Sequence, residues 1–286
     1  MKKSWTIFAM ATALAPAAVH AQATDPAANR TQRAEERQRQ DQDDSRPASD
    51  WRLFVSSGAF FTTGDYGTET RTNSLSVPLS ARLRSGPLRL SATLPYLRIA
   101  GSRSIIGGGD EGPIVDDRAP QTEREVRQGL GDLSLRARYR VAPASWDGIE
   151  LDLISRVKLP TGSRRKGLST GELDYSAGGE LSYTGGRVVP FAEVQYRING
   201  DPPGRDFRNS IASSVGASLP AGRGLATVSY DYSGSRIRGR AGAHSLNGGL
   251  SFPIARRLNL GGFGSVGLSR RAEDFSIGSV LTARVF

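Results

Sequence analysis

The chain has 286 residues, 37% of them hydrophobic and 23% charged, with no cysteine and a formal net charge of +10. The absence of cysteine excludes a disulfide scaffold and any thiolate site, catalytic or zinc-binding. The basic residues are spread along the whole chain and form no dense basic helix, so we expect no nucleic-acid partner.

The N-terminus has the parts of a secretory signal peptide. Lys2 and Lys3 precede a mostly apolar run over residues 5–19, and residues 19–21 (Val-His-Ala) fit a small-residue cleavage site. The apolar run is shorter than the ~20 residues that a spanning helix needs, and no cysteine follows it to carry a lipoprotein anchor. We expect residues 1–21 to be removed on export.

A polar segment follows over residues 22–50. Its central part, residues 29–44, consists almost wholly of Gln, Arg, Glu and Asp. Such a composition cannot bury apolar area, so we predict a disordered N-terminal segment in the periplasm. A plug or a partner-binding tail is the alternative interpretation of this segment.

From Trp51 onward the hydrophobic period is two, which is the period of a strand with one apolar face. The segments have roughly ten residues, the length of a tilted membrane strand. We predict an all-β fold for residues 51–286, a transmembrane antiparallel β-barrel of about twelve strands. The expected strands lie near residues 51–61, 74–84, 88–98, 133–141, 149–159, 174–184, 188–197, 210–219, 225–232, 243–252, 258–268 and 275–286.

The connections between these strands alternate between long and short. Short connections lie near residues 85–87, 142–148, 185–187, 220–224 and 253–257, and longer ones separate the other strands. This alternation is typical of short periplasmic turns and longer extracellular loops, and it predicts a barrel in the bacterial outer membrane with both termini in the periplasm.

Aromatic residues gather near the expected strand ends rather than the strand middles. Amphipathic rings at two heights are typical of the interface girdles of a membrane barrel. Those near the short turns are Trp51, Tyr139, Tyr183 and Phe252, and those near the long loops are Tyr96, Tyr175, Tyr196, Tyr230 and Tyr232.

The chain ends on Phe286. A terminal Phe on the last strand resembles the assembly signal of bacterial outer-membrane proteins, although Phe286 is out of phase with the apolar row that precedes it. We expect the barrel-assembly machinery to be a partner during insertion, and outer-membrane lipid to surround the folded barrel.

If the apolar rows face lipid, the opposite rows line a lumen. An arginine or lysine on the lipid face would cost ~2–4 kcal/mol at the bilayer midplane, so these charges predict a hydrated, ion-paired interior. The candidate lumen-lining residues are Arg82, Arg84, Arg89, Arg136, Arg138, Arg140, Glu150, Asp152, Arg156, Lys158, Asp174, Glu180, Glu193, Arg197 and Asp231. Asp132 belongs to the same rows and is expected to pair with Lys158 at the external rim.

The expected loop over residues 99–129 is the longest connection. It contains three consecutive glycines at 107–109 and a group of carboxylates at Asp110, Glu111, Asp116 and Asp117. Clustered carboxylates can hold calcium, but their spacing matches no EF-hand loop, and we expect no metal and no cofactor. The loop is instead a candidate constriction or lid.

His244 is the histidine that remains after cleavage, and it raises an enzymatic alternative. The surrounding residues superficially resemble the His-x-Ser-Asn pattern of outer-membrane lipid hydrolases. Here Ser245 follows directly and falls on the other strand face, while Leu246 occupies the position two residues on. A base and a nucleophile must lie within hydrogen-bond reach, so we expect no enzymatic activity.

Two stretches carry a family resemblance. Residues 129–139 read GLGDLSLRARY, and residues 158–163 read KLPTGS, followed by LSTG at 168–171. Together they resemble the bacterial family described as "putative MetA-pathway of phenol degradation". The resemblance implies an outer-membrane barrel that acts as a channel for small aromatic or hydrophobic compounds, and it brings no site residues with it.

The favoured function at this stage is passive uptake of small-molecule solutes through an outer-membrane, porin-like channel. The first alternative is a structural or partner-binding barrel without transport. The second alternative is a lipid-modifying enzyme that uses His244.

Overall fold

A computed structural model of the chain describes residues 51–107, 114–115 and 124–286. The expected signal peptide, the polar segment over residues 22–50 and the carboxylates Asp110, Glu111, Asp116 and Asp117 lie outside these residues. In the described ranges no helix is both long and apolar enough to cross a membrane.

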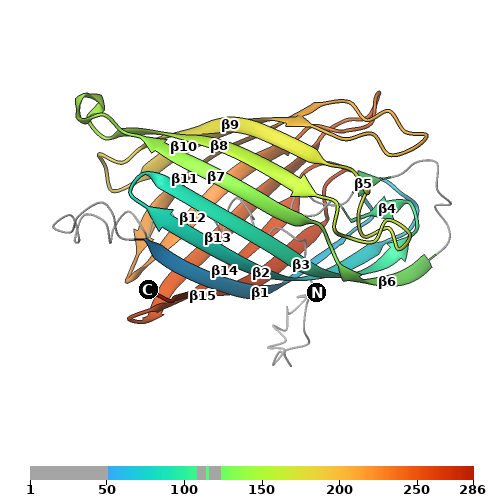
Figure 1. The fold of residues 1–286 in the computed structure, drawn as a ribbon, viewed down its shortest axis with the longest axis horizontal. Coiled ribbons are helices and arrows are strands. Elements are labelled where there is room, and N and C mark those ends of the chain that lie inside the picture. Colours follow the sequence, from blue (N-terminus) through green and yellow to red (C-terminus); the bar gives the residue numbers. More distant parts are fainter. Residues whose placement is uncertain (1–50, 108–113, 116–123) are drawn as a thin grey trace, which may run out of the picture.

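The described residues form a closed antiparallel β-barrel (Figure 1). Pairing of β2 with β3 closes the ring, and β6 and β7 lie end to end along β3, so the thirteen strands of the sheet make a wall of twelve. The predicted barrel of about twelve strands is confirmed. The wall strands are β1 (Arg52–Gly64), β2 (Thr72–Ser85), β3 (Leu88–Ser102), β6 (Arg124–Leu130), β7 (Leu133–Val141), β8 (Ile149–Leu159), β9 (Asp174–Tyr183), β10 (Val189–Ile198), β11 (Ser210–Ala221), β12 (Gly224–Ser233), β13 (Ala243–Ala255), β14 (Leu258–Gly267) and β15 (Phe275–Arg284).

The connections are sorted by length, as predicted. Two-residue turns join β2 to β3, β11 to β12 and β13 to β14, while β1 and β2 are separated by residues 65–71 and β8 and β9 by residues 160–173. We name the two ends of the barrel the turn end and the loop end. The C-terminus lies at the turn end (Figure 1).

The two faces of each wall strand differ in chemistry. On β8, Leu153 points outward and is 49% exposed, whereas its neighbour Asp152 points inward and is 1% exposed. Apolar side chains face outward on every wall strand, because only that face meets hydrocarbon. The outward aromatic residues Trp51, Tyr139, Tyr183 and Phe252 lie near the turn end, and Tyr96, Tyr175, Tyr196 and Tyr230 lie near the loop end.

The predicted loop over residues 99–129 is wrong at both ends. Strand β3 continues to Ser102 and β6 begins at Arg124, and the two pair from Tyr96 opposite Leu130 to Ser102 opposite Arg124. Their outward residues include Arg98 and Gln128, both exposed. A strand that extends past the bilayer needs no apolar outward row, so the alternation that marks a membrane strand weakens there.

A β-bulge interrupts the wall at Gly131 and Asp132. Tyr96 pairs with Leu130 and Thr93 pairs with Ser134, so three steps along β3 correspond to four along its partner. The extra residue changes which positions face inward. Outward residues are even-numbered in β6 and odd-numbered in β7.

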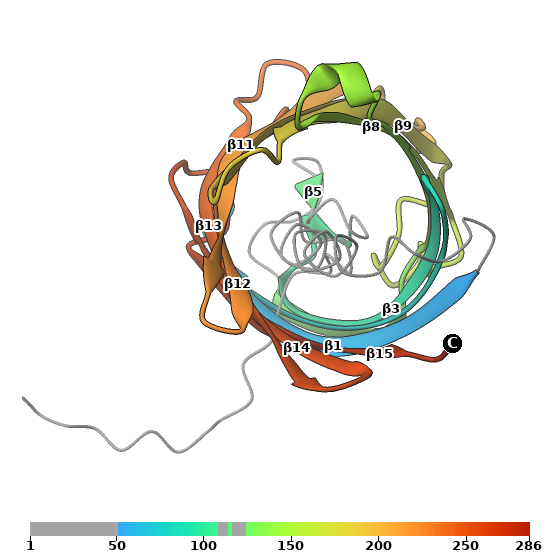
Figure 2. The same ribbon diagram turned by 90° about the vertical axis from the view of Figure 1, so that its left-hand side faces the viewer.

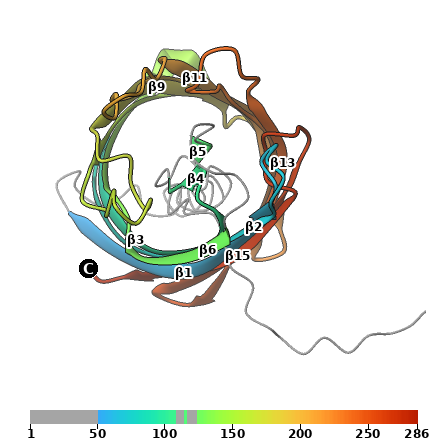
Figure 3. The same cartoon turned by 90° about the vertical axis from the view of Figure 1, so that its right-hand side faces the viewer.

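A described part of the connection between β3 and β6 lies inside the ring. It contains a short hairpin of β4 (Ile105–Ile106) and β5 (Ile114–Val115). Both views along the barrel place this hairpin inside the circle of strands (Figures 2 and 3), and Figure 1 places it toward the loop end. The candidate constriction of the sequence analysis therefore has a folded element within the lumen.

Candidate functional site: the lumen of the barrel

The candidate lumen-lining residues all lie on inward rows of the wall. None of them is exposed, whereas each of their strands has exposed residues on its outward face. Arg84, Arg89, Arg138, Asp152, Arg156, Lys158, Asp174 and Glu180 are buried, and Arg82, Arg136, Arg140, Glu150, Glu193, Arg197 and Asp231 are half-buried.

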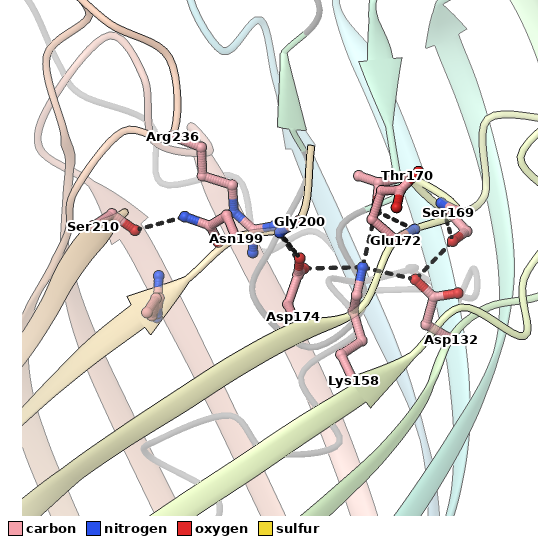
Figure 4. A network of polar contacts seen from close by, with 12 residues as sticks. Asp132, Lys158, Ser169, Thr170, Glu172, Asp174, Asn199, Gly200, Ser210 and Arg236 are labelled. Atoms are coloured by element: carbon pink, nitrogen blue, oxygen red, sulfur yellow. Dashed lines mark hydrogen bonds and ion pairs between the residues drawn. The ribbon is translucent and has the colours of Figure 1, made fainter. Parts of the chain in front are cut away.

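Lys158 is the centre of an ionic cluster at the loop end (Figure 4). Its Nζ lies 3.0 Å from Asp132 Oδ2 and 2.9 Å from Asp174 Oδ2, and it donates a 3.0 Å hydrogen bond to Thr170 Oγ1. The Lys158 side chain is fully buried. The expected rim pair of Asp132 and Lys158 is thus in contact, in a place closed to solvent rather than on an open rim.

The two carboxylates of this cluster also hold loop backbone. Asp132 accepts a 2.9 Å hydrogen bond from the Gly162 amide and a 2.8 Å hydrogen bond from Ser169 Oγ. Asp174 accepts a 2.9 Å hydrogen bond from the Gly200 amide and a 2.9 Å contact from Arg236 Nη1 (Figure 4). Three loops, over residues 160–173, 199–209 and 234–242, are thereby tied to the wall.

Arg138 is the centre of a second ionic cluster, nearer the turn end. Its guanidinium lies 2.9 Å from Asp152, 3.4 Å from Glu180 and 3.4 Å from Glu193. Arg140 also reaches Asp152, at 3.2 Å. These charges come from four neighbouring strands, β7 to β10, and they neutralise one another across the wall.

Acidic residues occupy one half of the wall only. The six neighbouring strands β13, β14, β15, β1, β2 and β3 contain no Asp or Glu at any position, and we call them the acid-free wall. Strands β7 to β12 form the acid-bearing wall, which carries every acidic member of the candidate lumen set.

The acid-free wall carries an aromatic patch that the sequence analysis missed. The rings of Phe60 on β1 and Phe263 on β14 lie 4.8 Å apart between centroids, and Val280 on β15 packs with them. Gly278 makes room, because a Cβ there would lie 2.7 Å from Phe60 Cδ1 and 2.9 Å from Phe263 Cζ. The alternation of apolar and polar residues does not show which of Phe60 and Phe61 points inward, because the two neighbours are equally apolar.

Apolar side chains also gather at the loop end of the lumen. Leu97 and Ile99 of β3 point inward and pack with Leu168, all three buried. A small pocket of about 90 Å³ lies between the β4–β5 hairpin, at Ile114 and Val115, and the loop over residues 234–242. Apolar and basic side chains line this pocket together, with Arg197, Arg236 and Arg240 among the basic ones.

The β4–β5 hairpin is fastened to neighbouring elements. Arg127 of β6 donates hydrogen bonds of 3.0 Å to the Ser102 carbonyl and 2.7 Å to the Ile105 carbonyl. The Gly107 amide donates a 2.8 Å hydrogen bond to the Gly167 carbonyl. The start of the hairpin is thus held by a strand on one side and by a loop on the other.

The loop over residues 268–274 brings a carboxylate against the acid-free wall. Glu273 Oε1 accepts a 2.6 Å hydrogen bond from Ser265 Oγ on β14. Desolvation raises the pKa of Glu273 above its ordinary value, Asp231 adds to the rise, and the bond from Ser265 opposes it. Burial likewise raises the pKa of the Tyr66 hydroxyl, with Glu273 and Asp274 adding to it.

His244 lies on the outward face of β13. Its Nδ1 hydrogen-bonds the Tyr230 hydroxyl, and its ring centroid lies 5.0 Å from that of Tyr232. Ser269 Oγ accepts a bond from the His244 backbone amide, not from the ring. The geometry around His244 is that of an aromatic cluster at the loop-end girdle.

No group of three or more potential metal ligands from His, Cys, Asp and Glu occurs within the described ranges of the chain. The ionic clusters described above instead pair carboxylates with lysine and arginine.

The family whose sequence pattern fits this chain is described as "Putative MetA-pathway of phenol degradation", and it matches residues 80–285. The match covers 206 of the 286 residues. The chain belongs to this family. The resemblance that the two short stretches indicated is confirmed over most of the barrel.

Solved structures give the same fold. An outer membrane channel from Pseudomonas putida F1 is similar at a TM-score of 0.55 and 15% identity, over 84% of this chain and 97% of the channel. The translocator domain of the autotransporter NalP from Neisseria meningitidis is similar at a TM-score of 0.50 and 13% identity, over 92% of this chain and 99% of that domain. A comparison with curated protein sequences gives no match. The fold is that of an outer-membrane β-barrel.

Proposed function

We propose that this protein is a passive outer-membrane channel for small molecules, aromatic and hydrophobic compounds among them. Family membership supports this proposal, and so does the barrel size. A wall of twelve strands is wider than the eight-strand barrels that side chains fill, and narrower than sixteen-strand porins.

The observation that carries the proposal is the chemistry of the inward rows. A barrel that served only as a support could fill its interior with packed apolar side chains. Here charged and hydroxyl side chains line the lumen beside an aromatic patch of Phe60, Phe263 and Val280. Charged and hydroxyl rows of this kind are typical of a barrel interior that admits water and polar solutes.

The orientation follows from the loop lengths. We infer that the turn end faces the periplasm and the loop end faces the exterior, as in other bacterial barrels with short turns on one side. Phe286 would then end the last strand on the periplasmic side, where the barrel-assembly machinery would engage it. Outer-membrane lipid would contact the outward apolar face.

Two other functions are less well supported. A structural barrel without transport leaves the charged lumen unexplained. For a lipid-modifying enzyme, the imidazole nitrogen of His244 would need a serine as its partner, and it bonds to the Tyr230 hydroxyl instead. We therefore infer that the protein is not an enzyme.

Conductance across a planar bilayer tests the proposal. The purified, folded barrel is expected to conduct in KCl and to prefer anions, because the inward set, with Asp132 included, has nine basic and seven acidic residues. Heat-denatured protein is the control. A folded barrel that never conducts, and that admits no arabinose in liposome swelling, would contradict the channel.

A further inference from the structure

The outward face of β3 and β6 changes from apolar to basic at the loop end. Tyr96 on β3 lies opposite Leu130 on β6, and both are exposed. At the next outward position Arg98 lies opposite Gln128, and both are exposed as well. This step measures about 7 Å along a strand, so the cation follows directly after the loop-end aromatic residues.

Lys166 brings a second cation to the same level. It belongs to the loop over residues 160–173, and its Nζ donates a 3.4 Å hydrogen bond to the carbonyl of Gln128, the residue opposite Arg98. The Lys166 side chain is exposed. Two distant parts of the chain thus place positive charge around Gln128, whose side chain points outward.

Arg124 adds a third cation beyond these two. Strand alternation places it on the same face of β6 as Gln128, and it is exposed. Strand β3 contains no Asp or Glu, and the one acid of β6, Glu125, pairs with Arg103 at 3.2 Å. We name Arg98, Arg124 and Lys166 the external basic patch.

The turn end of the same part of the wall has no such patch. Residues 85–87, which join β2 to β3, and residues 142–148, which join β7 to β8, contain no Arg or Lys. The outward residues of β3 and β7 near this end are Leu88, Leu90, Tyr139 and Val141. On these strands the outward positive charge is therefore confined to one end of the barrel.

This position and this asymmetry suit a phosphorylated lipid. Bacterial outer membranes carry the glycolipid lipid A in the outer leaflet only, with its phosphates at the level of the headgroups. Basic side chains beside a membrane-spanning segment attract anionic headgroups. Guanidinium groups bind phosphate through charge-assisted hydrogen bonds, and an ammonium group adds a compact positive charge.

We propose that the external basic patch binds lipid A of the outer leaflet through its phosphate groups. The acyl chains of the bound lipid pack on the outward apolar side chains nearer the membrane, Tyr96 and Leu130 among them. This inference goes beyond the channel proposal and takes from it only the orientation, with the loop end at the exterior.

Native mass spectrometry of the purified, folded barrel in detergent, with added lipid A, measures this binding. Lipid A without its phosphates is expected to bind at least about tenfold more weakly, because the charge-assisted bonds are lost. Inorganic phosphate in large excess should displace little lipid A, since it makes no contact with the apolar face. Complete displacement would indicate a site for free anions and overturn the lipid assignment.

Three variants test the residues of the patch. Arg98→Gln, Arg124→Gln and Lys166→Gln are each expected to weaken lipid A binding about fivefold, because each removes one cation at the headgroup level. Arg223→Gln is the matched control, since Arg223 is exposed in the turn between β11 and β12. In detergent without lipid A all four variants should keep the heat-dependent gel shift of the wild type, which verifies folding.

The outcomes separate the patch from the channel proposal. Equal binding of lipid A with and without phosphates would overturn the patch and leave conductance untouched, and so would equal lipid A binding by Arg98→Gln and Arg223→Gln. Phosphate-dependent lipid A binding by a barrel that does not conduct would support the patch and contradict passive transport alone.

Discussion

The two halves of the lumen wall use charge in different ways. On the acid-bearing wall each central cation is surrounded by carboxylates, as Lys158 is by Asp132 and Asp174, and Arg138 by Asp152, Glu180 and Glu193. On the acid-free wall the arginines face one another across β1, β2 and β3. Similar side chains therefore have opposite consequences for the barrel.

The difference shows that the charged residues of one lumen can have different roles on its two walls. Where acids and bases alternate, the charges fix strands and loops in place and leave little field for a solute. Where arginines face one another on neighbouring strands that carry no Asp or Glu, the like charges oppose the strand pairing. Equal substitutions on the two walls should therefore have different effects on stability.

The largest expected effect is the loss of Lys158. Lys158→Met leaves Asp132 and Asp174 buried beside each other without their shared cation. Removing one partner of a buried ion pair costs about 3–5 kcal/mol. We expect a large fall in the temperature at which the barrel loses its heat-dependent gel shift.

Lys166→Met is the matched control for that experiment, since Lys166 is exposed in the loop over residues 160–173. A second measurement uses Asp132→Ala, Lys158→Ala and the double variant. Because the two side chains touch, the double variant should lose less stability than the sum of the single losses. Additive losses would mean that the contact contributes nothing of its own.

A second pair of variants compares the walls directly. Arg138→Gln leaves three carboxylates around an uncharged side chain, although Arg89 and Arg140 still reach Asp152, so we expect a loss of about 2–3 kcal/mol. Arg84→Gln relieves like-charge opposition from Arg52 and Arg89 and should stay within about 1 kcal/mol of the wild type. If Arg138→Gln and Arg84→Gln lower the free energy of urea unfolding equally, the two walls do not differ in the way described.

The smallest expected effect concerns Glu273, the loop carboxylate that contacts the acid-free wall. A raised pKa means that folding disfavours the ionised form, so the penalty appears as the pH rises above the ordinary value of 4.5 and is absent well below it. Glu273→Gln removes the penalty and keeps an acceptor for Ser265. The variant should therefore be more heat-resistant than the wild type at pH 8 and equal to it at pH 3.5.

Much of the fold was predictable because lipid imposes a simple rule on each membrane strand. Alternation and loop lengths give twelve strands and both faces. This rule applies only to residues inside the membrane. The sequence analysis therefore predicts a loop where β3 continues to Ser102 and β6 begins at Arg124. Outward residues there need not be apolar.

The candidate site was predictable row by row but not as a whole. Alternation places Arg82, Arg84 and Arg89 inward, yet it cannot tell which residue of one strand faces which residue of the next. That information resides in the register, which the turns and the bulge set. The aromatic pair of Phe60 and Phe263 was not predicted, because Phe61 lies beside Phe60 and glycines flank Phe263, so the alternation of apolar and polar residues is not visible there.

The bulge at Gly131 and Asp132 has a consequence for which sequence changes the family can tolerate. Substitutions in this strand alter one side chain, whereas a one-residue deletion at the bulge would invert β7 relative to β6. Arg136, Arg138 and Arg140 would then enter the hydrocarbon at ~2–4 kcal/mol for each one at the midplane. We therefore expect insertions and deletions at the bulge to be much rarer among family members than substitutions. A deletion that does occur should be accompanied by an insertion in the same strand that restores the inward face.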